Sequence, residues 1–187
     1  MVVLLLLLIP LIGACFLFLY KGDHRFASAA ALQVSFASLL VMGARLFYWN
    51  TPEMLTFSAS WLTSLGSSFS LQMDGLGTML SLLTTISYFL LFWYLKGRTI
   101  ERPAAFFGWL LLAQVGMLGV FLSIDSLLFY FFWELALIPM YFLASQWGGV
   151  KRIPVTFKFF IYTFLGSVFM LIGILYLQSK TADHSFA

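Results

Sequence analysis

Long apolar stretches separated by short polar connections follow one another along the whole chain. Five stretches of about transmembrane length contain no Asp, Glu, Lys or Arg, and a sixth, 126–150, contains only Glu134. A bilayer core about 30 Å thick is crossed by about 20 apolar residues in a helix. We therefore predict an all-α integral membrane protein whose single domain, 1–187, has about six transmembrane helices. Their expected positions are about 1–20, 27–47, 75–96, 103–123, 125–147 and 154–179.

The longest connection, 48–74, has a different pattern. Apolar side chains alternate with polar ones at Phe69, Leu71 and Met73. Gly66 lies among serines that favour a turn, so we predict a short extracytoplasmic hairpin or interfacial segment, with a structural role such as contact with a neighbouring subunit. Amphipathic aromatic residues favour the headgroup layer, and here they are Tyr48, Trp49 and Trp61. We expect Asp74 to cap the N-terminus of the third helix.

Composition excludes a soluble domain. The chain is 62% hydrophobic and 9% charged, with a mean hydropathy of +0.99, whereas soluble domains carry about 25% charged residues. The single Cys15 excludes an internal disulfide framework and a cysteine metal cluster. The sequence IGAC at 12–15 resembles a lipoprotein cleavage site, but no Lys or Arg precedes the apolar stretch. A signal peptide normally has such a positive region, so we expect the first segment to be retained.

The basic residues predict an orientation. Seven of the ten Lys and Arg residues fall in three connections, 21–26, 96–102 and 148–153. Short loops rich in Lys and Arg face the cytoplasm. We therefore predict that these three connections are cytoplasmic and that the N-terminus is extracytoplasmic. The formal charge of +3 follows from the loops and does not indicate nucleic-acid binding.

Glu134 is an ionisable acid within an apolar helix, and its helical neighbours are polar. Tyr130, Tyr141 and Ser145 are spaced so that they share its face. Pro139 cannot donate to the carbonyl of residue 135 and should kink the helix, which leaves room for water. An intramembrane acid of this kind is a candidate for proton exchange. The alternative is a buried acid that only fixes helix packing.

Lys158 is a second candidate within the membrane. It lies about 6 Å along its helix, and its depth differs from that of Glu134 by about 12 Å. That gap is too long for a salt bridge and favours a water-linked relay. The alternative is a lysine that extends to the headgroups.

Small and hydroxyl-bearing residues mark the third and fourth helices. The third helix has one polar face, formed by Ser81, Thr84, Thr85 and Tyr88. Such hydroxyls join membrane helices or, alternatively, form a proton wire. We expect Gly116 and Gly119 to allow close helix approach. The sequence contains no nucleotide loop, nucleophilic triad or metal constellation, so we expect no cofactor, no metal and no chemistry on an organic substrate.

Three longer motifs indicate a family. FYFFWELALIPMYFLASQWGG at 129–149, KFFIYTFLGS at 158–167 and FSLQMDGLG at 69–77 resemble the chain M subunits of bacterial NADH:quinone oxidoreductase, respiratory complex I. The same fold is shared by its other antiporter-like membrane subunits and by multisubunit cation/proton antiporters. The resemblance covers nearly all of the chain and is strongest from about 70 to 170.

The resemblance implies a function and a site. Glu134 matches the family's glutamate of the fifth helix, which takes part in proton translocation together with a lysine on the seventh helix. Lys158 is not that lysine, and this sequence stops before it and before the second inverted repeat, so we expect the chain to be incomplete at its C-terminus. The implied protein couples quinone reduction, carried out elsewhere in the complex, to proton pumping.

The resemblance also implies a setting. The expected partners are other membrane subunits of a respiratory complex, the lipid bilayer and protons, with no nucleic acid. The expected location is the bacterial inner membrane. The alternatives are a subunit of a multisubunit sodium/proton antiporter and a structural membrane scaffold that does not pump.

Overall fold

The structure is a computed structural model that describes residues 2–47, 55–62 and 66–180. Within these residues six helices are long and apolar enough to cross a membrane, which confirms the predicted number and the all-α membrane class. The helices are α1 (Val2–Leu19), α2 (His24–Phe47), α4 (Gly75–Leu95), α5 (Pro103–Leu122), α6 (Ser126–Trp147) and α7 (Arg152–Lys180). Tyr48 and Trp49, expected in the headgroup belt, lie outside the described residues.

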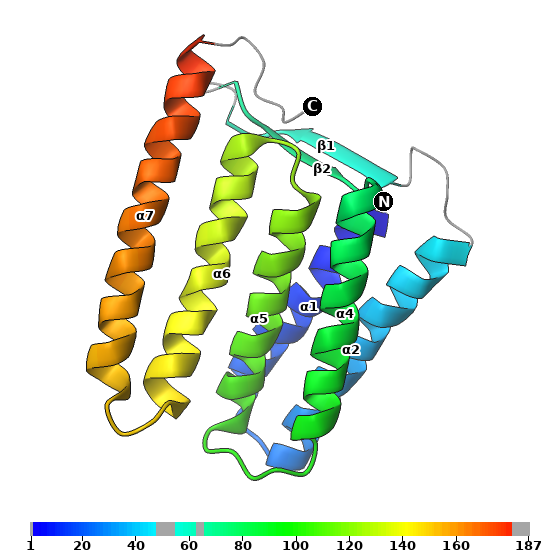
Figure 1. Cartoon of the computed structure of the whole chain (residues 1–187). Coiled ribbons are helices and arrows are strands. Elements are labelled where there is room, and N and C mark those ends of the chain that lie inside the picture. Colours follow the sequence, from blue (N-terminus) through cyan, green and yellow to red (C-terminus); the bar gives the residue numbers. More distant parts are fainter. Residues whose placement is uncertain (1, 48–54, 63–65, 181–187) are drawn as a thin grey trace.

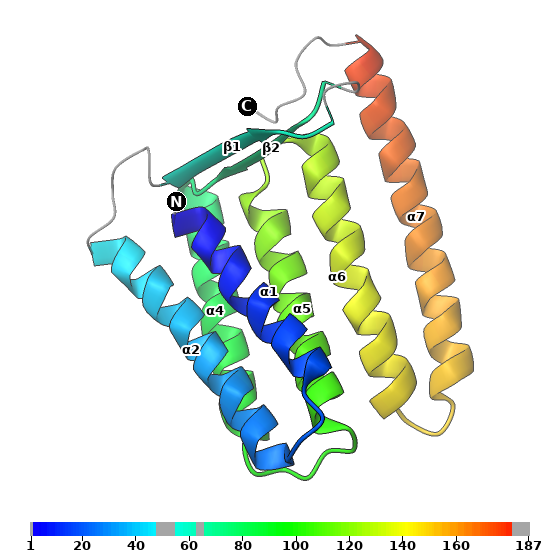
Figure 2. The ribbon, with the colours of Figure 1, turned by 180° about the vertical axis from the view of Figure 1, so that it is seen from behind.

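The six helices stand side by side with their connections gathered at two ends (Figure 1). The α1–α2, α4–α5 and α6–α7 connections lie at one end, here called the basic end. The opposite end, here called the hairpin end, carries the two strands and the α5–α6 connection. Figure 2, the view from behind, shows α1 in front of α4 and α5, while α7 stands at one edge beside α6. The three connections rich in Lys and Arg therefore share one end, as their alternation along the chain predicts.

The hairpin consists of β1 (Thr56–Ser60) and β2 (Ser68–Gln72), which pair antiparallel with Thr56 opposite Gln72 and Ser60 opposite Ser68. Gly66, in the connection between the strands, has a φ of 69°, a conformation that suits glycine. The hairpin predicted from the alternating pattern is thus confirmed. β2 also bonds the α5–α6 connection, because the Ile124 amide donates to the Ser70 carbonyl at 3.1 Å.

Two helices begin earlier than expected. α2 begins at His24 and not at 27, and α7 begins at Arg152 and not at 154. The expected starts marked the ends of apolar stretches, but a membrane helix can place polar residues of its first turn in the headgroup layer. Pro154 fits within the first turn of α7 because the N–H groups of a first turn have no partner inside the helix. With 29 residues, α7 is about 43 Å long.

Asp125 fixes the hairpin to the start of α6. Its side chain is buried and accepts hydrogen bonds from the Leu127 and Leu128 amides at 2.9 and 3.0 Å, as an N-cap does. The Ser67 hydroxyl donates to the same carboxylate at 2.7 Å, and the Ser68 amide donates at 3.2 Å. One carboxylate therefore caps a transmembrane helix and holds the hairpin over it. Asp74 caps α4 as expected, with the Gly77 amide donating to its side chain.

The helices α5 and α6 approach closely through glycine. A Cβ added to Gly116 would lie 2.7 Å from the Ala136 Cα, and one added to Gly119 would lie 2.1 Å from the Phe132 ring. No real Cβ tolerates such distances, so both positions require glycine at this packing. This bears out the expectation that the two glycines allow close helix approach.

Replacing Asp125 by Ala should lower the free energy of unfolding by about 2–3 kcal/mol, because four donors lose a charged acceptor. The check is the thermal unfolding midpoint of the protein in lipid nanodiscs. Asp74→Ala is the matched control, since Asp74 also caps a helix but is exposed. An equal loss of stability in both variants would contradict the special role of Asp125.

Gly116→Ala should lower the unfolding midpoint, because backbone atoms of Ala136 cannot move aside and the two helices must separate, at a cost of about 1–3 kcal/mol. Gly173→Ala on α7 is the control, because its new Cβ meets nothing within 4 Å. It should leave the midpoint unchanged or raise it slightly, since Ala has the higher helix propensity. Identical midpoints for the two variants would show that the α5–α6 contact is looser than described.

Candidate functional site

Glu134 lies inside α6, eight residues after its first residue and so about 12 Å from that end of the helix. The side chain is half-buried, and its Oε1 atom is buried without a hydrogen-bond partner among the described residues. A polar atom in that position normally finds a partner, because its desolvation is otherwise uncompensated. The unsatisfied carboxylate oxygen is thus the most unusual chemical feature of α6.

The polar face of α6 is turned toward α7. The Tyr130 side chain contacts both Glu134 and Ser167 of α7 through its hydroxyl group. Further along the helix, the Tyr141 ring packs against Phe160 of α7, with centroids 5.1 Å apart. The structure therefore brings Tyr130, Glu134 and Tyr141 to one helix pair, as their spacing predicts.

This polar face points away from α5. The α5 contact is made by Phe132 and Ala136, each two residues from Glu134 and so about 200° around the helix from it. Glu134 therefore lies on the side of α6 that faces away from α5 and borders α7.

Pro139 is buried within α6, which continues through it to Trp147. Because proline has no N–H group, the Leu135 carbonyl receives no hydrogen bond from position 139. That carbonyl lies one residue after Glu134, so a second acceptor is available beside the acid. The kink expected at Pro139 remains a prediction.

Lys158 is not brought to Glu134. It is exposed on α7, whereas Ser167 is buried on the face of α7 that meets α6. Nine residues separate Lys158 from Ser167, which is a rotation of about 180° and a rise of about 14 Å. The lysine therefore lies on the opposite face of α7 and nearer the basic end.

The hydroxyl groups of α4 mostly bond their own helix. Thr84 donates to the Leu80 carbonyl at 2.8 Å and Thr85 to the Leu82 carbonyl at 2.9 Å. Among the described residues, the hydroxyls of these two threonines therefore donate within their own helix and not to another helix. Tyr88 instead lines an apolar cavity of about 380 Å³ between α4, α5 and α6, together with Met117 and Trp133.

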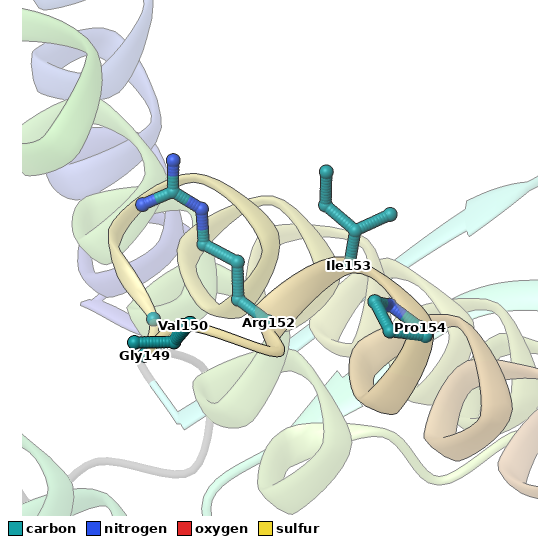
Figure 3. Close-up of a pocket in the computed structure, with 6 residues that line it drawn as sticks. Gly149, Val150, Arg152, Ile153 and Pro154 are labelled. Carbon is teal, nitrogen blue, oxygen red and sulfur yellow. The ribbon is translucent and has the colours of Figure 1, made fainter.

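A second cavity, of about 610 Å³, lies at the α6–α7 connection. Figure 3 shows five of the residues that line it: Gly149, Val150, Arg152, Ile153 and Pro154. The nearby Gly148 is fourteen residues after Glu134, about 21 Å along α6. This cavity is therefore open space around a loop at the basic end and is not part of the surroundings of the acid.

Two features of this region do not follow from the sequence expectations. Ser167 was not singled out, although Thr156, Phe160 and Ser167 follow helical spacing and form the face of α7 that meets α6. No local pattern marks Asp125, because its partners Ser67 and Ser68 are remote in the chain. Within the described residues there is no group of three His, Cys, Asp or Glu side chains that could hold a metal ion.

Comparisons with known proteins identify the family. Residues 123–187 match a family described as "NADH:quinone oxidoreductase/Mrp antiporter, TM". F(420)H(2) dehydrogenase subunit M of Methanosarcina mazei is 36% identical over 176 residues, which are 91% of this chain and 35% of that protein. NADH-quinone oxidoreductase subunit M of Rhodobacter capsulatus is 34% identical over 166 residues, covering 86% of this chain and 31% of that protein. The chain thus spans about a third of these relatives (35% and 31%).

Solved structures show the same fold. A chain of respiratory complex I from Thermus thermophilus superposes with a TM-score of 0.84 at 26% identity, over 100% of this chain and 38% of that one. A chain of the Mrp complex from a Dietzia species gives a TM-score of 0.76 at 17% identity, over 97% of this chain and 20% of that one, and this likeness concerns the fold alone. Together with the six apolar helices, these matches show that the chain is a multi-pass membrane protein of the family of NADH:quinone oxidoreductase and Mrp antiporter membrane subunits, as its resemblance to subunit M had indicated.

Proposed function

We propose that this chain takes part in proton translocation coupled to quinone reduction, as part of a multisubunit respiratory membrane complex. The observation that carries the proposal is Glu134: a carboxylate deep in an apolar helix, with one buried oxygen that has no partner among the described residues. The relatives at 36% and 34% identity are an F(420)H(2) dehydrogenase subunit M and an NADH-quinone oxidoreductase subunit M, which favours this function over others of the family.

The surroundings of Glu134 suit an acid that changes its protonation state. When charged, the carboxylate can accept a hydrogen bond from the Tyr130 hydroxyl, which it contacts. When neutral, it can donate its proton to water held beside the Leu135 carbonyl, which receives no hydrogen bond from Pro139. Tyr141 would line the same path toward the basic end. No cofactor on this chain is needed for these steps.

Lys158 has a more distant part in this proposal. Its exposed position on the far face of α7 excludes a direct exchange with Glu134 and leaves room only for a relay through further groups. Such groups would come from segments that pack against the exposed face of α7. The lysine is therefore proposed as a relay residue at the basic end and not as the partner of the acid.

Sodium/proton antiport is the second candidate, supported by the fold it shares with the Mrp complex. Transport that depends on sodium would favour it. A scaffold role is the third, in which Glu134 only fixes the contact between α6 and α7. These three functions differ in what they require of the carboxylate.

We expect Glu134→Gln to abolish most proton pumping and coupled quinone reductase activity in the assembled complex, because the amide keeps the shape but cannot titrate. Assembly should survive, since a neutral amide costs less in a bilayer than a carboxylate. Glu134→Asp should keep part of the activity. The measurement is the pumping rate of purified, assembled complex in vesicles.

The control for this experiment is Asp74→Asn, which changes an exposed acid at a helix end and keeps its capping ability. It should pump at the wild-type rate. If Glu134→Gln also pumps at that rate, the acid is a packing residue and the proposed function of this site is wrong.

We also infer that the basic end faces the cytoplasm of a bacterial inner membrane and that the N-terminus is extracytoplasmic. Seven basic residues that lie in the connections at one end or in the first turn of the helix that follows support this. With Cys15 replaced, cysteines at positions 98 and 151 should resist a membrane-impermeant thiol reagent added from outside, while one at 59, on exposed β1, should react. Outside labelling of position 98 would reverse the orientation.

A further inference from the structure

A second group of buried polar side chains lies between α2, α4 and α5, on helices that do not carry Glu134. Ser35, Ser81 and Gln114 have no solvent exposure. Both serine Oγ atoms and both polar atoms of the Gln114 amide lack a hydrogen-bond partner among the described residues. Four unsatisfied polar atoms in the interior of apolar helices are costly, so their arrangement requires a cause.

The ring of Phe107 shows which helices Gln114 faces. Phe107 on α5 packs against both His24 of α2 and Phe92 of α4, with ring centroids 6.2 and 6.0 Å apart. Gln114 follows Phe107 by seven residues, which returns it to the same face of α5, about 10 Å further along. The amide is therefore directed to the place where α2, α4 and α5 meet.

The two serines are placed by the same contacts. Ser35 follows His24 by eleven residues, and Ser81 precedes Phe92 by eleven. Eleven residues are about three helical turns. Ser35 therefore lies on the same face of α2 as His24, and Ser81 on the same face of α4 as Phe92, each about 16 Å further from the basic end. Counted along the helices from the Phe107 contacts, both serines lie about 16 Å and Gln114 about 10 Å toward the hairpin end.

Neighbouring hydroxyls show that these three side chains are a distinct group. Ser38, three residues from Ser35 and equally buried, donates to the Val34 carbonyl at 3.2 Å. Thr85, four residues from Ser81 and equally buried, donates to its own helix as well. The buried hydroxyls on the same two helices can thus be satisfied locally, whereas Ser35 and Ser81 are not.

We propose that α2, α4 and α5 enclose a buried water site whose polar wall is formed by Ser35, Ser81 and Gln114. Water can donate to the amide Oε1, accept from the amide Nε2 and do either with a hydroxyl. A cation would not use the N–H donors of the amide. The side chains are neutral, so the site holds water but stores no proton.

The site is independent of Glu134 and of the function proposed for it. Gln114 lies two residues, or about 200°, from Gly116, which faces α6. Its three side chains are fully enclosed by helices of this chain, so no additional segment is needed to complete it.

The direct test is a high-resolution cryo-electron microscopy map of the protein in its assembled complex in lipid nanodiscs. We expect ordered density at hydrogen-bonding distance from the Gln114 amide and from at least one of the two serine Oγ atoms. Direct hydrogen bonds between the three side chains, or no density between them, would overturn the proposal.

A matched set of variants tests the same site in solution. Ser35→Ala and Gln114→Met should each lower the thermal unfolding midpoint, and the double variant should lower it by less than the two shifts added, because both act on the same water. In the control cycle, Ser38→Ala and Gln114→Met should be additive. Additivity in both cycles would count against a shared water site, and if Gln114→Met does not fold, the map of the unaltered protein decides.

Discussion

The hydrocarbon core of a bilayer offers no hydrogen-bond partner, and this constraint governs the whole structure. Each span is an uninterrupted helix, and buried hydroxyls such as those of Thr84 and Thr85 bond carbonyls of their own helix. Where α6 begins, the N–H groups of its first turn are satisfied by Asp125, which also holds Ser67. Polar atoms on Glu134, Ser35, Ser81 and Gln114 are among those that escape this pattern, and they are therefore places where function or bound water is to be sought.

The same constraint explains how much of the fold could be predicted. Spans and their number follow from charge-free stretches, and the hairpin follows from alternation at Phe69, Leu71 and Met73. The sequence does not predict which helices pack against each other, because one apolar helix surface can pack against any other. The role of Asp125 could not be foreseen either, since it depends on a hairpin that returns from 58 residues away in the chain.

The candidate site shows the same division between local and tertiary information. Helical periodicity places Tyr130 and Tyr141 beside Glu134, and rise per residue gives the depth of Lys158. Periodicity cannot tell which face of α6 meets α7. The contact of Gly116 with Ala136 shows that Glu134 faces away from α5. The contact of Ser167 with Tyr130 shows that Lys158 lies on the far side of α7.

The two polar locations differ in enclosure, and the difference fits their chemistry. A group that changes its charge must be able to regain solvation in its charged form, because an isolated charge in hydrocarbon is far more costly than a neutral amide. Glu134 lies half-buried at the α6–α7 side, where water and further segments can reach it. Gln114 is fully enclosed and neutral, so it can bind water in a place where a carboxylate would need a permanent proton. The central helix α5 separates the two, with glycine toward the acid-bearing helix and an amide toward the enclosed site.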